Sequence, residues 1–370
     1  MFIWSPVRNH MNTTPRYCSM TEAQELEVSG EESDDETANS SSATSRRLRH
    51  QKLALSKTKL KKLAREEQDR QQKLLVVQAF HRFYESQYGD RWSKIFRALQ
   101  EKPRAACLVN KFADMAVFEE TMKGVANLRR LSFVSVPLYE CDDRFPHPER
   151  DDRNVYTYYM LDAASVLATE ALRLAPDDNV LDLCAAPGGK SVAILQHLNL
   201  PVGSLTANEV SNDRRRRLWK VITDYLPEDL RQHVSVTGRD GTQWSQPNSF
   251  DKVLVDAPCS SERHLLQNHE ELSKWSEHRT VHCSKRQLAL LNAALKNVCI
   301  GGLVVYSTCS ISNVENDKVI EKALRKKKID FEVVNDSWLL GEKTEYGWIV
   351  LPDTSDGWGP LYFCVLRRLA

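Results

Sequence analysis

Two hydrophobic patterns alternate along the second half of the chain. From residue 156 onward, short apolar runs alternate with stretches in which apolar residues recur at helical spacing. This alternation is typical of a parallel α/β sheet, because strands whose two faces are both covered by helices carry continuous apolar runs. We therefore predict parallel strands at residues 180–183, 204–207, 234–236, 253–255 and 303–306, with helices between them.

The pattern after residue 306 predicts how this sheet ends. Ser312 is followed three residues later by Glu315, which indicates a capping box at the start of a helix. Two later apolar strips, 348–351 and 361–366, flank a turn rich in proline and glycine and predict an antiparallel pair at the sheet edge. The prediction for residues 151–370 is a Rossmann-like α/β domain with a mostly parallel, seven-stranded sheet and an antiparallel edge.

The first 150 residues divide into segments of different composition. Residues 21–45 are acidic and then rich in serine and threonine, and such a segment cannot bury enough apolar area to fold. Residues 46–65 are basic and interleaved with leucines, which suits a phosphate-binding helix or, as we prefer, a solvated and partly helical leader. We assign 21–72 to a disordered leader, acidic and then basic, and 73–150 to a small helical module, because apolar residues recur there at helical spacing.

The first 20 residues contain Arg8, His10 and Arg16 but no acidic residue. This composition suits an organelle transit peptide and equally an ordinary N-terminus, and the acidic tract behind it is atypical of a transit peptide. No apolar run approaches the roughly 20 residues of a spanning helix, so we expect no membrane segment.

Whole-chain charge and cysteine spacing exclude little by themselves. Lysine and arginine number 51 against 50 aspartate and glutamate, so net charge says nothing about partners. The nine cysteines are odd in number and never occur at C-x-x-C spacing. We therefore expect reduced thiols, an intracellular compartment and no metal site.

The first predicted strand runs into a glycine turn. Gly188 and Gly189 allow close approach to a ligand, and Lys190 with the following helix N-terminus offers donors to a carboxylate. Ligands of open α/β sheets bind at the carboxyl ends of strands, so this turn is a candidate cofactor site. A Walker loop would need glycine at the position of Cys184, and no G-x-G-x-x-G occurs. A plain structural turn is the alternative.

Acidic residues follow the next two predicted strands. Glu209 comes after the second strand, where a carboxylate can accept both ribose hydroxyls of an adenosyl group. Asp240 and Gly241 follow the third strand, and Asp240 can accept from an adenine amino group. Arg214, on the helix after Glu209, can reach the cofactor or an RNA phosphate. Each residue alone suits a surface loop, but their recurrence at strand ends favours a cofactor.

The fourth and fifth strands each end near a cysteine. Cys259 follows Asp256 of the fourth strand, and Cys309 follows the fifth. Adjacent strands lie about 5 Å apart, so both thiols can face one crevice. Carbon 5 of cytosine is a poor nucleophile, but addition of a thiolate to carbon 6 creates an enamine whose carbon 5 can accept a methyl group. Spacing alone leaves the two cysteines interchangeable, and Asp256 can contact the base or the cofactor.

At these residues the chain resembles the Sun-domain (RsmB/Sun-type) family of RNA cytosine-5 methyltransferases. The resemblance rests on three motifs, Asp182-Leu-Cys-Ala-Ala-Pro-Gly-Gly-Lys190, Asp256-Ala-Pro-Cys259 and Ser307-Thr-Cys309-Ser310, and extends over residues 75–370. It implies a class I S-adenosylmethionine-dependent fold, Cys309 as nucleophile and Cys259 as the residue that aids product release. The cofactor contacts that it implies are Gly188, Gly189, Lys190, Glu209, Arg214, Asp240, Gly241 and Asp256. Many members have aspartate at position 209.

Within this family, the chain is most similar to the mitochondrial ribosomal-RNA member, through residues 83–92, 158–165 and 359–364. The resemblance implies mitochondrial small-subunit rRNA as the substrate, a role in mitoribosome biogenesis and a location in the matrix, with nucleus or cytoplasm as the alternative. It also implies a termination-factor-like helical-repeat protein as partner. A mitochondrial transfer-RNA methyltransferase, a DNA cytosine methyltransferase and a non-catalytic RNA-binding assembly factor are the alternatives, and the second thiol argues against the DNA enzyme.

Overall fold

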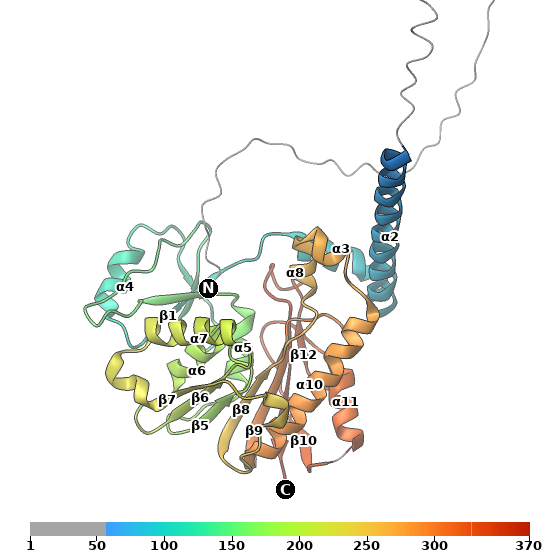
Figure 1. Ribbon diagram of the computed structural model, residues 1–370. Helices are drawn as coiled ribbons and strands as arrows, with labels where there is room; N and C mark the ends of the chain where they lie inside the picture. The colour runs from blue at the N-terminus through green and yellow to red at the C-terminus, as the bar shows by residue number, and fades with distance from the viewer. Residues whose placement is uncertain (1–56, 327) are drawn as a thin grey trace, which may run out of the picture. The chain divides into compact units, whose positions relative to one another are not determined.

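The computed structural model of the protein describes residues 57–326 and 328–370 (Figure 1). The predicted transit peptide and the acidic part of the leader therefore lie outside the described residues. Residues from Gln72 to Ala370 form one compact unit, and residues 57–71 belong to a separate unit.

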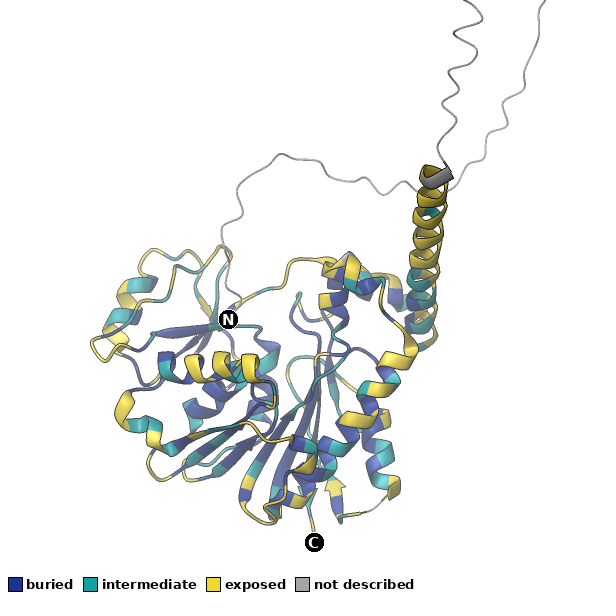
Figure 2. Ribbon diagram, viewed as in Figure 1, coloured by how far each residue is buried: buried dark blue, intermediate teal, exposed yellow. Residues whose placement is uncertain are grey.

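Helix α2 spans Lys57–Tyr88 and so begins within the leader that we assigned to residues 21–72, whose basic part we expected to be partly helical. Its first half is rich in lysine, arginine, glutamate and glutamine, which favour helix, and Lys62 and Glu66 pair across one turn at 3.8 Å. Most side chains of this half are exposed (Figure 2). Among the described helices, none is both long and apolar enough to cross a membrane.

The main sheet has the order β11-β12-β13-β9-β8-β5-β6-β7, and β10 pairs with β13. Its central strands β5 to β9 are parallel, and β13 runs antiparallel beside β9. On its other side β13 pairs antiparallel with β12, as the sequence pattern predicted for this edge. The described sheet has nine strands, two more than predicted, because the short strands β10 and β11 pair with β13 and β12. Its strands are β5 (Asn179–Asp182), β6 (Ser204–Asn208), β7 (Val234–Thr237), β8 (Phe250–Asp256), β9 (Val298–Thr308), β10 (Phe331–Val333), β11 (Glu342–Lys343), β12 (Trp348–Val350) and β13 (Leu361–Arg368).

Side chains of the parallel strands alternate between two hydrophobic cores. Val180 belongs to the core that contains residues of α5, α6 and α7, and Leu181 belongs to the core that contains residues of α10 and α11. The same alternation recurs at Val304 and Val305 of β9. Both faces are therefore covered, which explains the continuous apolar runs (Figures 1 and 2). The helices are α5 (Ala164–Glu170), α6 (Gly189–His197), α7 (Asn212–Tyr225), α8 (Glu262–Gln267), α9 (His269–Leu272), α10 (Glu277–Asn297) and α11 (Asp317–Lys326), with 3-10 turns η2 (Glu228–His233) and η3 (Gly241–Gln243).

The predicted helical module is present, but a small sheet follows it. The helices are α2, η1 (Gly89–Arg91), α3 (Trp92–Gln100) and α4 (Met115–Met122). A four-stranded antiparallel sheet has the order β2-β3-β1-β4, with β1 (Ala106–Val109), β2 (Arg129–Arg130), β3 (Leu138–Glu140) and β4 (Tyr158–Leu161). Because β4 pairs with β1, the small sheet crosses the domain boundary that we expected at residue 150.

The capping box predicted at Ser312 does not form. Helix α11 begins at Asp317, and the hydroxyl of Ser312 is buried without a partner among the described residues. Glu315 instead accepts hydrogen bonds from the backbone of Ser260, at 3.1 Å, and the side chain of Gln287, at 2.7 Å. The Glu315 side chain therefore binds residues that are distant in sequence and does not cap the helix.

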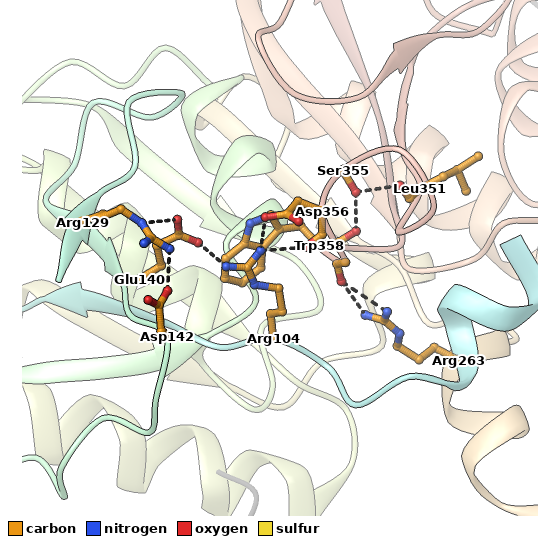
Figure 3. Close-up of polar contacts among 10 residues, drawn as sticks. Arg104, Arg129, Glu140, Asp142, Arg263, Leu351, Ser355, Asp356 and Trp358 are labelled. Atoms are coloured by element: carbon orange, nitrogen blue, oxygen red, sulfur yellow. Dashed lines mark hydrogen bonds and ion pairs between the residues drawn. The ribbon is translucent and has the colours of Figure 1, made fainter. Parts of the chain in front are cut away.

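The loop between β12 and β13 joins the small sheet to the rest of the unit (Figure 3). Arg104 forms ion pairs with Glu140 of β3 and with Asp356 of the loop, and its guanidinium lies 4.6 Å from the ring centroid of Trp358. On the other side, Arg263 of α8 donates hydrogen bonds to the carbonyls of residues 357 and 359. The loop is thus held by two arginines from different parts of the chain.

Replacing Arg104 with alanine should lower the free energy of unfolding by about 1–3 kcal/mol, because a partly buried ion pair with Glu140, an exposed one with Asp356 and a cation–π contact are lost together. Urea unfolding measures the change. Arg129, whose side chain is 50% exposed and which also pairs with Glu140, is the matched control. Equal losses for Arg104→Ala and Arg129→Ala would contradict the importance assigned to the loop contact.

Candidate active site

The candidate site lies at the carboxyl ends of the parallel strands. The chain passes from β5 to β6 and β7 on one side, and then returns to β8 and β9 on the other side of β5. This reversal opens a crevice beyond the carboxyl ends of β5 and β8, where ligands of such sheets bind. The predicted residues follow the carboxyl ends of β5, β6, β7, β8 and β9 in turn.

The glycine turn lies between β5 and α6. Gly188 has a φ of 123°, which L side chains rarely adopt, and a Cβ added there would lie 2.8 Å from Cγ1 of Val221. At Gly189, the first residue of α6, an added Cβ would lie 3.0 Å from Cε1 of Tyr159. Backbone conformation and close packing therefore both favour glycine at position 188, whereas at position 189 only the tight approach of the Tyr159 ring does so.

Lys190 and Asp256 form an ion pair across the crevice, with Nζ and Oδ2 2.9 Å apart. The hydroxyl of Ser307 donates to the other carboxylate oxygen of Asp256 at 3.2 Å. Burial lowers the pKa of Lys190, but the charge and the hydrogen bond of Asp256, together with the charges of Cys309 and Asp182, outweigh it, and the net pKa of Lys190 is raised. The ammonium therefore stays charged beside the ends of β8 and β9.

Glu209 and Arg214 connect the end of β6 to the glycine turn. Glu209 is 3% exposed, accepts from the backbone of Ser211 at 2.8 Å and pairs with Arg214 at 2.8 Å. Arg214 also donates to the carbonyl of Ala186 at 2.6 Å. The predicted ligand Arg214 is thus already engaged in orienting the Glu209 carboxylate.

Asp240 and Gly241 have structural explanations of their own. Asp240 caps η3, because its Oδ1 accepts from the backbone and the hydroxyl of Thr242 at 3.0 and 2.8 Å. A Cβ at Gly241 would lie 2.9 Å from Cδ2 of Leu290 and 3.2 Å from Cγ of Leu183. Packing against these leucines therefore accounts for the glycine, whereas the exposed Asp240 carboxylate keeps free acceptor positions.

The two predicted cysteines lie in contact. Sγ of Cys259 and Sγ of Cys309 are 3.0 Å apart, as the neighbouring ends of β8 and β9 led us to expect. Cys309 is exposed, whereas Cys259 is half-buried. The hydroxyl of Ser261 lies 3.5 Å from Sγ of Cys309. One accessible thiol is therefore flanked by a second thiol and a hydroxyl.

This contact makes the two thiols electrostatically different. Hydrogen bonding with Cys259 lowers the pKa of Cys309, and the nearby Ser261 hydroxyl lowers it further. The same hydrogen bond, together with burial, raises the pKa of Cys259. Cys309 is thus the thiol that ionises first, with Cys259 as its hydrogen-bond donor.

A family model described as 16S rRNA methyltransferase RsmB/F matches residues 169–363, which include both cysteines and the glycine turn. The match covers more than half of the chain. The chain belongs to this Sun-domain family. It is an S-adenosylmethionine-dependent RNA cytosine-5 methyltransferase, as the resemblance of its motifs had implied.

Known members of the family resemble the chain over most of its length. The mouse (Mus musculus) 5-cytosine rRNA methyltransferase NSUN4 is 33% identical over 345 residues, with 80% of this chain and 89% of that protein covered. A mouse protein named tRNA (cytosine(34)-C(5))-methyltransferase, mitochondrial, is 32% identical and covers 80% of this chain and 90% of its own length. The solved structure of NSun6 from Pyrococcus horikoshii with SFG has a TM-score of 0.65 at 18% identity, with 79% of this chain and 98% of that chain covered, which shows the shared fold.

The residues of the site fit the family's methyl donor. A carboxylate offers about four acceptor positions, and Glu209 and Asp256 each use only part of theirs within the described chain. The sequence also gave no reason to single out Asp182, at the end of β5, whose buried Oδ1 has no partner among the described residues. Burial raises the pKa of Asp182 to about 7. Glu209 and Asp256 therefore keep unused acceptor positions for a ligand rich in donors, whereas the free oxygen of Asp182 is buried beneath the crevice.

Sequence reasoning also missed a set of buried polar residues next to the cysteines. Ser260 and Ser310, which follow Cys259 and Cys309, both contact the buried side chains of Glu262 and Glu315. The repeated Cys-Ser pair was the one signal available in the sequence. Glu262 follows no local pattern, and the spacing of Glu315 from Ser312 suggested a helix cap instead.

Alkylation of Cys309 by iodoacetamide should reach half of its maximal rate at a lower pH than alkylation of an ordinary cysteine, because the thiolate forms at lower pH. In Cys259→Ala the main hydrogen-bond donor is lost, so the midpoint should move to higher pH. Mass spectrometry of the modified peptide across a pH series measures both curves. Identical midpoints in the two proteins would refute the assigned contact.

Proposed function

We propose that the protein methylates a cytosine of mitochondrial small-subunit rRNA through a covalent bond between Cys309 and carbon 6 of the base. The observation that carries the mechanism is the contact between the thiols, which leaves Cys309 exposed with a lowered pKa. The 33% identity to the mouse protein named as an rRNA methyltransferase supports the substrate. A role in mitoribosome biogenesis follows from that substrate.

The reaction begins at Cys309. Its thiolate adds to carbon 6, the new S–C bond forms, and the electrons of the carbon 5–carbon 6 double bond make carbon 5 nucleophilic. S-adenosylmethionine supplies the methyl group when bound. A base then takes the proton from carbon 5, its electron pair re-forms the double bond, and the S–C bond breaks to return the thiolate of Cys309.

Cys259 serves the last stage in this proposal. Its raised pKa keeps it protonated at 3.0 Å from Cys309, so it can donate a hydrogen bond to the departing sulfur. A leaving thiolate that is stabilised by a hydrogen bond departs more readily. The arrangement therefore supports Cys309 as the attacking thiol and Cys259 as the residue that aids release.

The neighbouring strand ends hold the methyl donor. Glu209, at the end of β6, is suited to the ribose hydroxyls, and Arg214 keeps its carboxylate oriented. Asp240 is suited to the adenine amino group, and the Lys190–Asp256 pair borders the reacting base or the donor. The turn of Gly188 and Gly189 forms the floor of the site, while Gly241 supports it by packing.

A mitochondrial transfer RNA is the second candidate substrate. The mouse mitochondrial tRNA enzyme is as similar as the rRNA enzyme, at 32% identity with 90% of its length covered. Bisulfite sequencing of total RNA from cells with and without the gene distinguishes the two. We expect one 5-methylcytosine of the small-subunit rRNA to disappear and to return with the wild-type protein but not with Cys309→Ala.

Other results of that experiment have defined meanings. Loss of a tRNA methylation alone would favour the second candidate. An unchanged methylation map with a ribosome assembly defect that Cys309→Ala rescues would overturn the enzymatic proposal and favour a non-catalytic assembly factor.

We further propose that the protein acts in the mitochondrial matrix with a helical-repeat partner of the termination-factor type. The mitochondrial relative supports the location. A fusion of residues 1–45 to a fluorescent reporter tests it, and a diffuse cytosolic or a nuclear signal would overturn it. Purification of the tagged protein from mitochondria tests the partner.

A further inference from the structure

Two glutamates are completely buried next to the cysteine loops. Glu262 is the first residue of α8, Glu315 lies between β9 and α11, and both are 0% exposed. Every hydrogen bond that they accept from the described residues comes from a neutral donor, which is a hydroxyl, an amide or a backbone N–H. Two buried carboxylates without a cationic donor are costly if both are ionised.

The hydroxyl contacts indicate that the pair shares a proton. Oγ of Ser260 contacts both carboxylates, and Oγ of Ser310 lies 3.1 Å from Glu262 and 3.5 Å from Glu315. Each hydroxyl can donate only one proton, so two hydroxyls cannot satisfy all of these contacts with both glutamates ionised. One carboxylic acid proton supplies the missing donor, as in other carboxylate pairs.

Each glutamate also binds the backbone of the opposite cysteine loop. Glu262 belongs to the Cys259 loop but accepts from the backbone N–H of Ile311, at 3.0 Å. Glu315 belongs to the Cys309 loop but accepts from the backbone N–H of Ser260, at 3.1 Å. These reciprocal bonds connect the two loops in both directions, directly beside the thiols that lie 3.0 Å apart.

We propose that Glu262 and Glu315 form a proton-sharing pair that positions the two cysteine loops and so maintains the contact between Cys259 and Cys309. They are positioning residues, because neither touches a thiol. That loss of the pair slows methyl transfer rests on the proposed function. That the pair keeps the two thiols in contact does not depend on it.

Helices hold the pair in place from two sides. Tyr84 of α2 donates to Glu262 at 2.7 Å, and Gln287 of α10 donates both to Glu315 and, at 3.0 Å, to the carbonyl of Pro258. Burial together with the charge of Glu262 raises the pKa of Glu315 to about 7. The shared proton is therefore retained below about pH 7 and lost as the pH rises, after which two like charges repel each other.

The other titratable groups around the pair do not account for a loss of a proton near pH 7. Burial raises the pKa of the phenols that face it, which are Tyr84, Tyr88 and Tyr306, so all three stay neutral. Burial likewise raises the pKa of Cys283, to about 11. Hydrogen bonding raises that of Cys259, and only Cys309 among these groups has a lowered pKa.

The test measures how fast diamide closes a Cys259–Cys309 disulfide, in which the oxidant takes up the two thiol hydrogens with their electrons. Glu315→Gln cannot acquire the second negative charge. The ratio of its closure rate to that of wild type should therefore be near one at pH 6.5 and rise at pH 8.5. Glu315→Ala and Glu262→Ala lose the bonds between the loops, and their closure should slow by ~10²-fold.

The control is Glu332→Gln, an exposed glutamate that pairs with Arg367, whose rate ratio should stay at one at both pH values. A pH-independent ratio for Glu315→Gln, or wild-type closure in both alanine variants, would overturn the proposal. If the alanine variants fail to fold, the ratio of the Glu315→Gln closure rate to the wild-type rate at the two pH values still tests the proposal.

Trapping of the covalent RNA adduct separates this proposal from the proposed function. With both correct, the alanine variants should form the adduct ~10²-fold more slowly, with unchanged binding of S-adenosylmethionine. Absence of an adduct in the wild-type protein, combined with the expected disulfide rates, would refute the proposed chemistry and support the positioning pair. Adduct formation at the wild-type rate in the alanine variants would refute the pair alone.

Discussion

Cys309→Ala should abolish methyl transfer to RNA, with a loss of ~10³-fold or more, because no other thiol of the site can add to the base in the same geometry. Cys259→Ala should behave differently. It keeps the nucleophile but loses the donor to the departing sulfur, so a covalent protein–RNA adduct should accumulate. Denaturing gels of labelled RNA measure the adduct, and transfer of a labelled methyl group measures turnover.

The control for the cysteine pair is Cys299→Ala, a free cysteine at the opposite end of β9. It should form no trapped adduct and should retain turnover. If Cys259→Ala eliminates the adduct and Cys309→Ala retains it, the two roles are reversed.

Gly188→Ala should lower the free energy of unfolding by about 2–4 kcal/mol, because two penalties coincide there. The φ of 123° is unfavourable for any L side chain, and the new Cβ would lie 2.8 Å from Cγ1 of Val221. The start of α6 must shift to relieve the contact, so binding of S-adenosylmethionine should weaken as well. Urea unfolding and calorimetric titration measure the two effects.

Gly124 provides a matched control because its φ of 86° is also positive, while an added Cβ would meet nothing within 4 Å. Gly124→Ala should cost only the backbone term of about 1–2 kcal/mol. The double variant Gly188→Ala with Val221→Ala should regain part of the lost cofactor affinity. Equal losses at positions 124 and 188 would argue against a steric conflict with Val221.

The central strands were predictable because burial on both faces leaves uninterrupted apolar runs such as Val253 to Val255. The small sheet was not predictable in this way. The buried run of β1 is only four residues long and reads equally as part of a helix, and β2 is a two-residue, exposed strand. Their pairing depends on partners that are distant in sequence, such as β4.

Some features of the candidate site could likewise be predicted from the sequence, and others could not. The glycine turn and both cysteines could be placed at strand ends from the sequence, because the ends of parallel strands converge. The difference between Cys259 and Cys309 could not, because it arises from a contact between residues 50 positions apart. Glu315 was assigned to a local cap by its spacing from Ser312, and only the fold reveals its distant partners Ser260 and Gln287.

The position of β13 has a consequence for protein synthesis. Strand β9, which leads to Cys309, pairs with β8 on one side and with β13 on the other. A growing chain on the ribosome therefore completes β9 long before residues 361–368 emerge to cover its second edge. A chain released early would expose the backbone of an apolar strand, which invites aggregation. Premature termination should thus yield an aggregated or degraded product instead of a partly active enzyme.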